Sequence, residues 1–198
     1  MTAPSAQSVI DGLRANRAKF EEFCNSLSDA ELETLVPPDN AWTVKDFIIH
    51  LVAFDDLTTE WVENVMAGDL AGPKANPDGS KFDIDEWNQQ RLEQCRAQPL
   101  EAVIETWRPE RERFLATLGK LSEEQMTQSV FFPGDNKRDG GQVPFGLFLH
   151  GLVRHDPIHV ADILKGLPER AQDPELAAWI DDRMVQWYQQ AMAGPAKR

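Results

Sequence analysis

The sequence predicts an all-α protein, a four-helix bundle with a long crossover connection and an extra C-terminal helix. Three observations support this prediction. Apolar residues recur with the 3.6-residue period of a helix in every long segment. No segment alternates between apolar and polar residues with the two-residue period of a strand, so we expect essentially no sheet. Four long helical segments, separated by loops of which at least one is long, match the layout of a bundle.

The length of 198 residues fits a single domain, 1–198, with its core in about 5–166 and the extra helix near 173–193.

The net charge of −13 disfavours binding to nucleic acid or to an anionic membrane. No apolar run approaches the roughly 20 residues that span a bilayer. We see no basic start followed by an apolar stretch, and the two cysteines form no paired motif, so we expect a cytoplasmic protein. The expected partner is a small-molecule substrate. The sequence leaves open whether the protein forms a homodimer.

The first long helix is expected over 5–27, where five apolar residues approximate one face: Val9, Leu13, Phe20, Phe23 and Leu27. A short helical turn should follow, because Ser28 and Glu31 have the spacing of a capping box. The same pattern returns 94 residues later, since RAKF and LSDAEL are echoed by RERF and LSEEQM. Chance similarity between two amphipathic helix ends is a serious alternative explanation. The echo also fits two helical hairpins, each made of a long helix, a short capped turn and a long helix.

After a loop at 36–40, a second long helix should run from about Trp42 to Met66, with Thr43 or Asn40 near its cap. Residues 68–84 contain three glycines and two prolines and form the long connection. This connection separates the first helical hairpin from the second.

Helical character resumes at Asp85 and continues to about Lys120, with a break near 98 and a kink near 109 where prolines occur. Residues 133–144 form another loop, and the fourth long helix should cover about 144–165. The last helix has a clear start, with Asp173 as its cap and a proline in its first turn.

The stretch HDPIHVADIL contains two of the four histidines of the chain. His155 and His159 lie about 40° apart around a helix, so their rings can converge on one metal ion. His150 lies about 140° from the first and about 180° from the second, and should point elsewhere. Such a pair alone is a weak signal, because many His-x-x-x-His pairs are merely solvated or packed.

A third ligand would strengthen the pair, and His50 is the remaining histidine. It lies in a largely apolar stripe of the second helix, which should face the bundle interior. It is either a buried histidine with a hydrogen-bond partner or the third ligand of a metal site that keeps one open position. Asp162 shares the face of His155 and His159. It is a fourth ligand, a hydrogen-bond partner of a ligand ring or of a bound water, or a solvent-facing residue.

Two segments resemble the DinB/YfiT-like family. AWTVKDFIIHLVAFDD is similar to its second-helix signature and HDPIHVADIL to its fourth-helix signature, and the agreement extends over about 5–166. The resemblance implies a four-helix bundle of DinB/YfiT type in which His50, His155 and His159 hold a divalent metal, with zinc or nickel expected. Two positions depart from the family pattern. Asp162 stands where the family often has Gln, and Pro157 is unusual inside the motif because it removes a backbone hydrogen bond.

The family also includes mycothiol-dependent maleylpyruvate isomerases and thiol-S-transferases. DIDEWNQQR (83–91) resembles the region before their third helix, which implies that Trp87, Asn88 and Arg91 line the mouth of a cofactor pocket. Arg91 would then pair with a carboxylate of the substrate or of a low-molecular-weight thiol. The alternative for Arg91 is a surface helix start with an intrahelical ion pair.

The expected function is therefore a divalent-metal-dependent enzyme that transfers a small thiol cofactor to an electrophile, or isomerises a substrate through it. The protein's own thiols, Cys24 and Cys95, show no paired histidine and should be inert. A metal-dependent hydrolase is the alternative enzyme, with Asp162 or Asp46 as base. A non-catalytic small-molecule binding or resistance protein is the alternative from another class.

Overall fold

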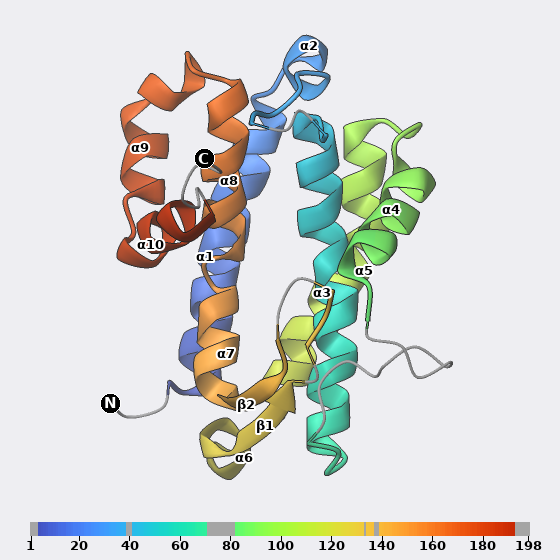
Figure 1. Cartoon of the computed structure of the whole chain (residues 1–198), viewed down its shortest axis with the longest axis vertical. Coiled ribbons are helices and arrows are strands. Elements are labelled where there is room, and N and C mark those ends of the chain that lie inside the picture. Colours follow the sequence, from blue (N-terminus) through green and yellow to red (C-terminus); the bar gives the residue numbers. More distant parts are fainter. Residues whose placement is uncertain (1–3, 39–40, 71–81, 133, 137–138, 193–198) are drawn as a thin grey trace. The chain divides into compact units, whose positions relative to one another are not determined.

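The computed structural model describes residues 4–38, 41–70, 82–132, 134–136 and 139–192. Its secondary structure is dominated by helices, which confirms the all-α prediction (Figure 1). The elements are α1 (Ala6–Asn25), α2 (Asp29–Leu32), α3 (Val44–Met66), α4 (Ile84–Cys95), α5 (Leu100–Leu118), α6 (Glu123–Thr127), β1 (Ser129–Phe132), β2 (Gly141–Pro144), α7 (Phe145–Leu152), α8 (His155–Gly166), the 3-10 helix η1 (Arg170–Gln172), α9 (Pro174–Ile180) and α10 (Arg183–Met192).

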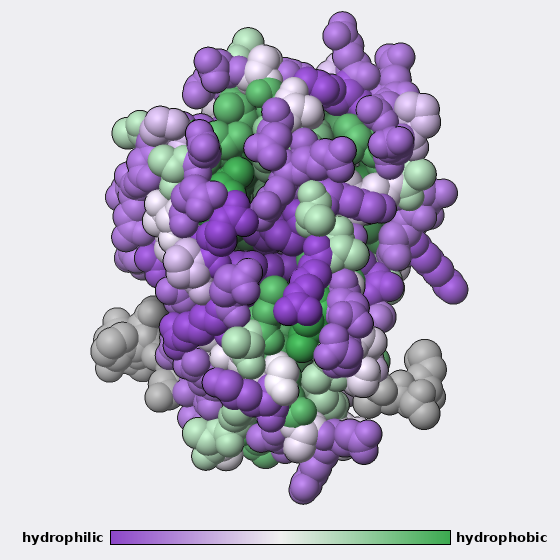
Figure 2. Space-filling view, turned by 180° about the vertical axis from the view of Figure 1, so that it is seen from behind, coloured by the Kyte–Doolittle hydropathy of each residue, from purple (hydrophilic) through white to green (hydrophobic). Residues whose placement is uncertain are grey.

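The surface seen in Figure 2 is mostly hydrophilic, as expected for an acidic chain. None of the helices in the described part of the chain combines the length and the apolar character needed to cross a membrane.

Most of the predicted long connection at 68–84 lies outside the described residues, as does Asn40. The predicted break near 98 is confirmed, because α4 ends at Cys95 and α5 begins after Pro99.

A small sheet corrects one expectation. β1 and β2 pair in antiparallel register, from Ser129 opposite Pro144 to Phe132 opposite Gly141. The sequence pattern favours essentially no sheet and a loop over 133–144, where the structure has the strand β2. Each strand has only four residues, which is too short for a two-residue alternation to stand out from the surrounding pattern.

The chain divides into two compact units, one comprising 1–12 and 49–152 and the other 13–48 and 153–198. The division passes through the middle of α1 and of α3, so each of these helices begins in one unit and continues without a break into the other. The hairpin β1–β2, α4, α5, α6 and α7 belong to the first unit. The second contains α2, α8, α9 and α10.

Each unit contains a buried arginine–aspartate pair. In the first unit, Arg111 on α5 donates to Asp55 on α3 at 2.9 Å. In the second unit, Arg17 on α1 donates to Asp156 on α8 at 3.0 Å. The two arginines are 94 residues apart, as are the two capping boxes that begin at Ser28 and at Ser122. The echo in the sequence therefore corresponds to a repeated local feature, a buried arginine followed by a capping box, although the aspartate partners lie at a different offset.

The fourth long helix is not continuous, which corrects the prediction of one helix over about 144–165. α7 ends at Leu152 and α8 begins at His155. Pro157 explains the break, because it has no N–H and its ring excludes the carbonyl four residues earlier from a helical position. That carbonyl belongs to Val153, and it accepts a hydrogen bond from Nδ2 of Asn16 at 2.6 Å.

The predicted last helix, 173–193, is also two helices. Asp173 caps α9 as expected, since its carboxylate accepts from the backbone N–H of Glu175 at 2.8 Å. A second cap follows within the predicted span. The carboxylate of Asp182 accepts from the backbone N–H of Met184 at 2.7 Å and so begins α10. Two aspartate caps inside one amphipathic stretch define two helix starts.

The contact between α6 and α7 predicts opposite effects for two Gly→Ala substitutions on α7. A Cβ at Gly146 would lie 2.5 Å from the backbone oxygen of Met126, so Gly146→Ala should lower the free energy of unfolding by about 1–3 kcal/mol. A Cβ at Gly151 would meet nothing within 4 Å, so Gly151→Ala should leave stability unchanged or raise it by up to about 1 kcal/mol. Urea unfolding of both variants measures the difference. Equal effects would contradict the close approach of α7 to Met126.

Candidate metal centre

The helix break before α8 places two histidines in the first turns of α8. His155 is the first residue of α8 and His159 lies one turn later. Their ring centroids are 4.9 Å apart and the rings are nearly perpendicular, at 84°. The neighbouring Asp156 is held by Arg17, which anchors the first turn of α8 to α1. The sequence prediction that the two rings share one face is confirmed.

Helix α3 supplies the third histidine. The ring of Phe47 on α3 contacts the ring of His159, with centroids 5.8 Å apart. His50 follows Phe47 by three residues on the same unbroken helix, and therefore lies on the same face. The His50 side chain is buried, with 7% of the residue exposed.

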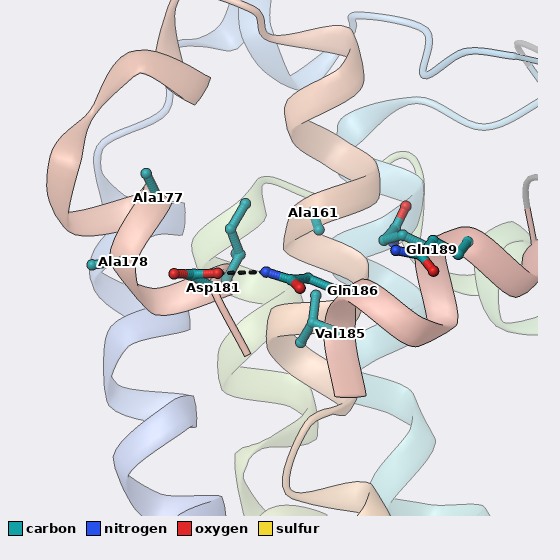
Figure 3. A pocket seen from close by; sticks show the side chains of 9 residues that line it. Ala161, Ala177, Ala178, Asp181, Val185, Gln186 and Gln189 are labelled. Carbon is teal, nitrogen blue, oxygen red and sulfur yellow. Dashed lines mark hydrogen bonds between the residues drawn. The ribbon is translucent and has the colours of Figure 1, made fainter. Parts of the chain in front are cut away.

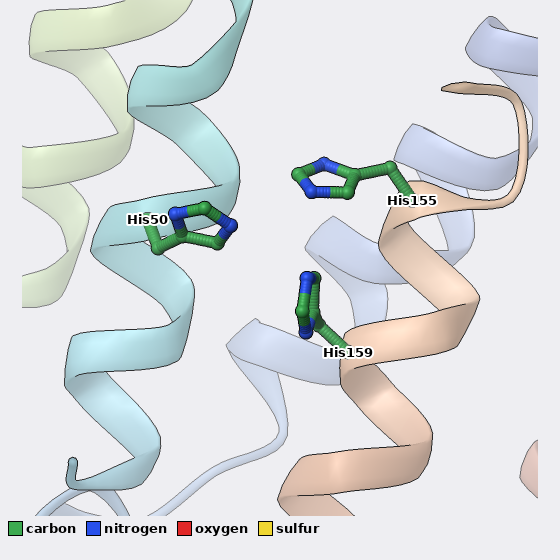
Figure 4. Close-up of side chains that lie close together, drawn as sticks. All are labelled: His50, His155 and His159. Atoms are coloured by element: carbon green, nitrogen blue, oxygen red, sulfur yellow. The ribbon is translucent and has the colours of Figure 1, made fainter. Parts of the chain in front are cut away.

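These three imidazoles form a cluster. Each of His50, His155 and His159 offers one nitrogen, and the three nitrogens lie within 4.8 Å of one another (Figure 4). Within the described residues, no other group of three or more His, Cys, Asp or Glu side chains is placed in this way. Three imidazole nitrogens are a ligand set typical of zinc and other divalent transition metals. The donor set thus fits a divalent ion.

Asn88 determines which nitrogen His50 presents. Nδ1 of His50 lies 2.9 Å from Oδ1 of Asn88, in a buried contact. An amide oxygen only accepts, so Nδ1 carries the proton and donates it, and Nε2 keeps its lone pair for a metal. Asn88, which was expected at the mouth of a cofactor pocket, lies on α4 with 7% of the residue exposed and contacts His50.

Asp162 has the same function for His159. Its Oδ2 lies 3.0 Å from Nδ1 of His159, and its Oδ1 accepts from Lys165 at 2.7 Å and from Gln189 at 3.0 Å. Burial alone would raise the pKa of Asp162. The hydrogen bonds from His159 and Lys165 outweigh this effect and hold that pKa below its ordinary value. Asp162 is therefore an ionised hydrogen-bond partner of the His159 ring, in agreement with one of the roles considered from the sequence.

Asp46, considered as a base, lies at the start of α3. Its carboxylate accepts from the backbone N–H of Thr43 at 3.0 Å, and the Thr43 hydroxyl accepts from the backbone N–H of Asp46 at 3.2 Å. This reciprocal arrangement is a helix cap, as expected for Thr43. Only 2% of Asp46 is exposed. Its carboxylate therefore stabilises the helix start that positions His50 one turn later.

Arg91 has partners on two other helices. Its guanidinium stacks against the rings of Trp87 and Trp107, at 5.2 and 5.3 Å, and donates to Asp56 on α3 at 3.2 Å. The ion pair thus joins two helices and is not the intrahelical pair considered from the sequence. About a quarter of the Arg91 side chain (23%) stays exposed.

The two thiols are both buried. Cys24 and Cys95 are each 1% exposed and neither forms a disulfide. Burial raises the pKa of the Cys24 thiol far above its ordinary value, so this thiol stays protonated at neutral pH. A protonated, inaccessible thiol is a poor nucleophile. Thiol chemistry at this protein therefore requires a thiol from outside the chain.

Residues 12–163 match the DinB superfamily, which is well over half of the chain. The chain belongs to the DinB superfamily. The match includes all three histidines of the cluster and ends before η1, α9 and α10. The resemblance found in the two sequence signatures is thus confirmed for the family. A comparison with curated proteins gives no match.

Solved structures similar to this DinB-superfamily chain include two kinds of protein. One is YfiT from Bacillus subtilis, described as a probable metal-dependent hydrolase with an unusual four-helix bundle topology. The TM-score is 0.65 at 17% identity, over 84% of this chain and 87% of YfiT. The other is the mycothiol-dependent maleylpyruvate isomerase, with a TM-score of 0.59 at 15% identity over 82% of this chain. A mutant of that isomerase gives the same TM-score at 14% identity. The chain spans 63% of the isomerase's length. These likenesses confirm the four-helix bundle.

His150 provides a control for the metal site of this DinB-superfamily protein. It lies on α7, before the helix break, and is not among the clustered nitrogens. We expect His150→Ala to leave the bound metal per chain unchanged, measured by elemental analysis of purified protein. Loss of metal in this variant would contradict the assignment of the ligands to His50, His155 and His159.

Proposed function

We propose that this protein is a divalent-metal-dependent enzyme whose ion is held by His50, His155 and His159. The observation that supports the proposal is the cluster of three imidazole nitrogens within 4.8 Å. Three neutral nitrogen ligands leave an open coordination position, which distinguishes catalytic sites from closed structural sites. The hydrogen bonds of His50 to Asn88 and of His159 to Asp162 orient two of the three rings for this role.

Zinc or nickel is the proposed ion. Imidazole nitrogen suits zinc, copper, iron and nickel, whereas magnesium, calcium and manganese prefer oxygen ligands. Asp162 is the nearest candidate for a harder ligand, but its two oxygens are bonded to His159, Lys165 and Gln189. The nitrogen donors therefore favour an ion of intermediate hardness, such as zinc or nickel, over a hard ion such as magnesium or manganese.

A divalent ion in such a site lowers the pKa of a bound thiol or water and polarises a carbonyl. We propose that the reaction is transfer of a small thiol cofactor to an electrophilic small molecule, or isomerisation through that cofactor. Arg91, held by Trp87 and Trp107, offers a cation for a carboxylate of the cofactor or substrate. Burial of both cysteines supports a thiol supplied from outside the chain. The fold relation to the mycothiol-dependent isomerase agrees with this proposal.

A metal-dependent hydrolase is the second candidate. The observation in its favour is the agreement with YfiT, a probable metal-dependent hydrolase of which the chain covers 87%. A hydrolase needs a base near the reacting water. The two carboxylates considered for that role are bonded elsewhere, Asp46 in the cap of α3 and Asp162 to His159. We prefer thiol transfer because Arg91 offers a cation for a cofactor carboxylate and because both cysteines of the chain are buried.

The proposed partner is a small molecule in the cytoplasm. The charge of −13 argues against nucleic acid and anionic membrane as partners. A homodimer is compatible with the proposal and is not required by it.

Turnover assays separate these functions. The metal-loaded protein is mixed with mycothiol, bacillithiol or glutathione and a generic electrophile, and separately with an activated ester without thiol. We expect thiol consumption that requires zinc or nickel and disappears in His155→Ala. Ester hydrolysis without any thiol would favour the hydrolase instead. Metal binding without turnover in either assay would leave a non-catalytic small-molecule binding protein.

A further inference from the structure

Helix α10 lies beyond residues 12–163, which match the superfamily, yet it reaches the metal centre. Nε2 of Gln189 donates to Oδ1 of Asp162 at 3.0 Å and to the backbone carbonyl of Ile158 at 3.1 Å. Both partners are acceptors, so the nitrogen end of the amide must face them. Oδ2 of the same Asp162 carboxylate meets Nδ1 of His159. The amide therefore fastens the carboxylate to the backbone of α8.

A second contact from α10 is independent of the first. The ring of Tyr188 stands edge-on to the ring of His159, with centroids 6.1 Å apart and an angle of 79°. Two consecutive residues of α10 thus contact either a candidate ligand or the carboxylate that orients it. His159 is flanked by Phe47 of α3 and by Tyr188 of α10.

Gln189 also lines a cavity of about 590 Å³ bounded by α8, α9 and α10 (Figure 3). Gln186 and Gln190 line the same cavity from the same helix. Gln186 is bonded to Asp181, as the dashed line in Figure 3 shows, and Gln190 is exposed. Gln186 and Gln190 thus have the same side chain as Gln189 and line the same cavity, but within the described residues neither hydrogen-bonds to Asp162 or His159. They can serve as matched controls.

We infer that Gln189 is a positioning residue of the metal centre, which acts on His159 through Asp162. The inference rests on the proposed function, because it concerns the ion that His159 would bind. Without the amide, Lys165 is the one donor to Oδ1 that remains among the described residues, and its side chain is 43% exposed. The carboxylate can then rotate, and the ring of His159 loses part of its fixed orientation. The extra C-terminal helix is thus a component of the site and not only a cover for the bundle.

The test compares Gln189→Met with the matched control Gln190→Met. Zinc and cobalt are titrated into the apo forms of both variants, and the visible absorption of the cobalt form is recorded. We expect Gln189→Met to weaken binding by about 3- to 10-fold, at or below the low end of the effects of groups that contact a ligand directly. The cobalt spectrum should change in Gln189→Met. Gln190→Met should match the wild type in affinity and spectrum.

A double-mutant cycle shows whether the effect passes through Asp162. Gln189→Met should have no further effect on affinity in the Asp162→Ala background. A full effect in that background, or wild-type affinity and spectrum in Gln189→Met itself, would overturn the inference while leaving the proposed function intact. Failure of the wild type to bind either ion would overturn the proposed function and the inference together.

Discussion

Replacing His155 by alanine is expected to abolish stoichiometric binding of zinc or nickel, and so are His50→Ala and His159→Ala. Each substitution removes one of three nitrogen ligands, and the affinity should fall by far more than the roughly 10- to 100-fold typical of groups behind the ligands. Elemental analysis of the purified variants and calorimetric titration of zinc, nickel and manganese into apo protein measure the effect. Equal affinity in the wild type and in the triple alanine variant would remove the chemical basis of the proposed enzyme.

The same titration repeated at several pH values tests the chemistry of the ligands. Imidazole binds a metal only when it is neutral, and its ordinary pKa is about 6.5. Affinity should therefore be highest above that pH and fall as the pH is lowered through it. A constant affinity down to about pH 5 would argue against imidazole ligands.

Arg111→Met is expected to lower the free energy of unfolding by about 3–5 kcal/mol, because it removes the guanidinium that pairs with the buried Asp55 carboxylate. The matched control is Arg113→Met on the same helix. Arg113 pairs with Glu63, but both side chains are more than 40% exposed, so its loss should cost about 0–1 kcal/mol. Urea unfolding followed by circular dichroism measures both variants.

A double substitution distinguishes a lost charge pair from lost packing. Arg111→Met combined with Asp55→Leu removes both charges from the interior, and should recover most of the stability lost in the single variant. If the double variant is as unstable as the sum of the two singles, the cost of Arg111→Met comes from packing of the arginine stem. Equal losses in Arg111→Met and Arg113→Met would contradict the difference in burial between the two pairs.

Local rules were sufficient to predict most of the helices. The cap at Thr43, the capping box at Ser28 and the cap at Asp173 depend on neighbours within three residues, so they are visible in the sequence. Local signals for the two helix breaks are harder to recognise. Pro157 and Asp182 lie inside continuous apolar patterns, which favour an unbroken helix over each stretch. A proline three residues into α8 is allowed in a first helical turn, which is how the chain uses it.

The metal site was predicted in part. The shared face of His155 and His159 follows from helix geometry, and the placement of His50 in an apolar stripe pointed to the interior. The partners of these rings come from more distant positions. Asn88 is 38 residues from His50, and Gln189 is 27 residues from Asp162. No spacing rule connects such positions, because tertiary packing alone brings them together.

The pair between Arg17 and Asp156 has a consequence for how the protein would acquire its ion. It fastens the first turn of α8, and with it His155, to α1 without any help from a metal. A chain that folds first and then loads its ion samples whatever divalent metals its surroundings supply. Since affinities of nitrogen sites rise along the series from manganese to copper, occupancy would reflect metal supply as much as the preference of the site. The supply of divalent metals, and not the folding reaction, would then determine what fraction of the protein carries an ion.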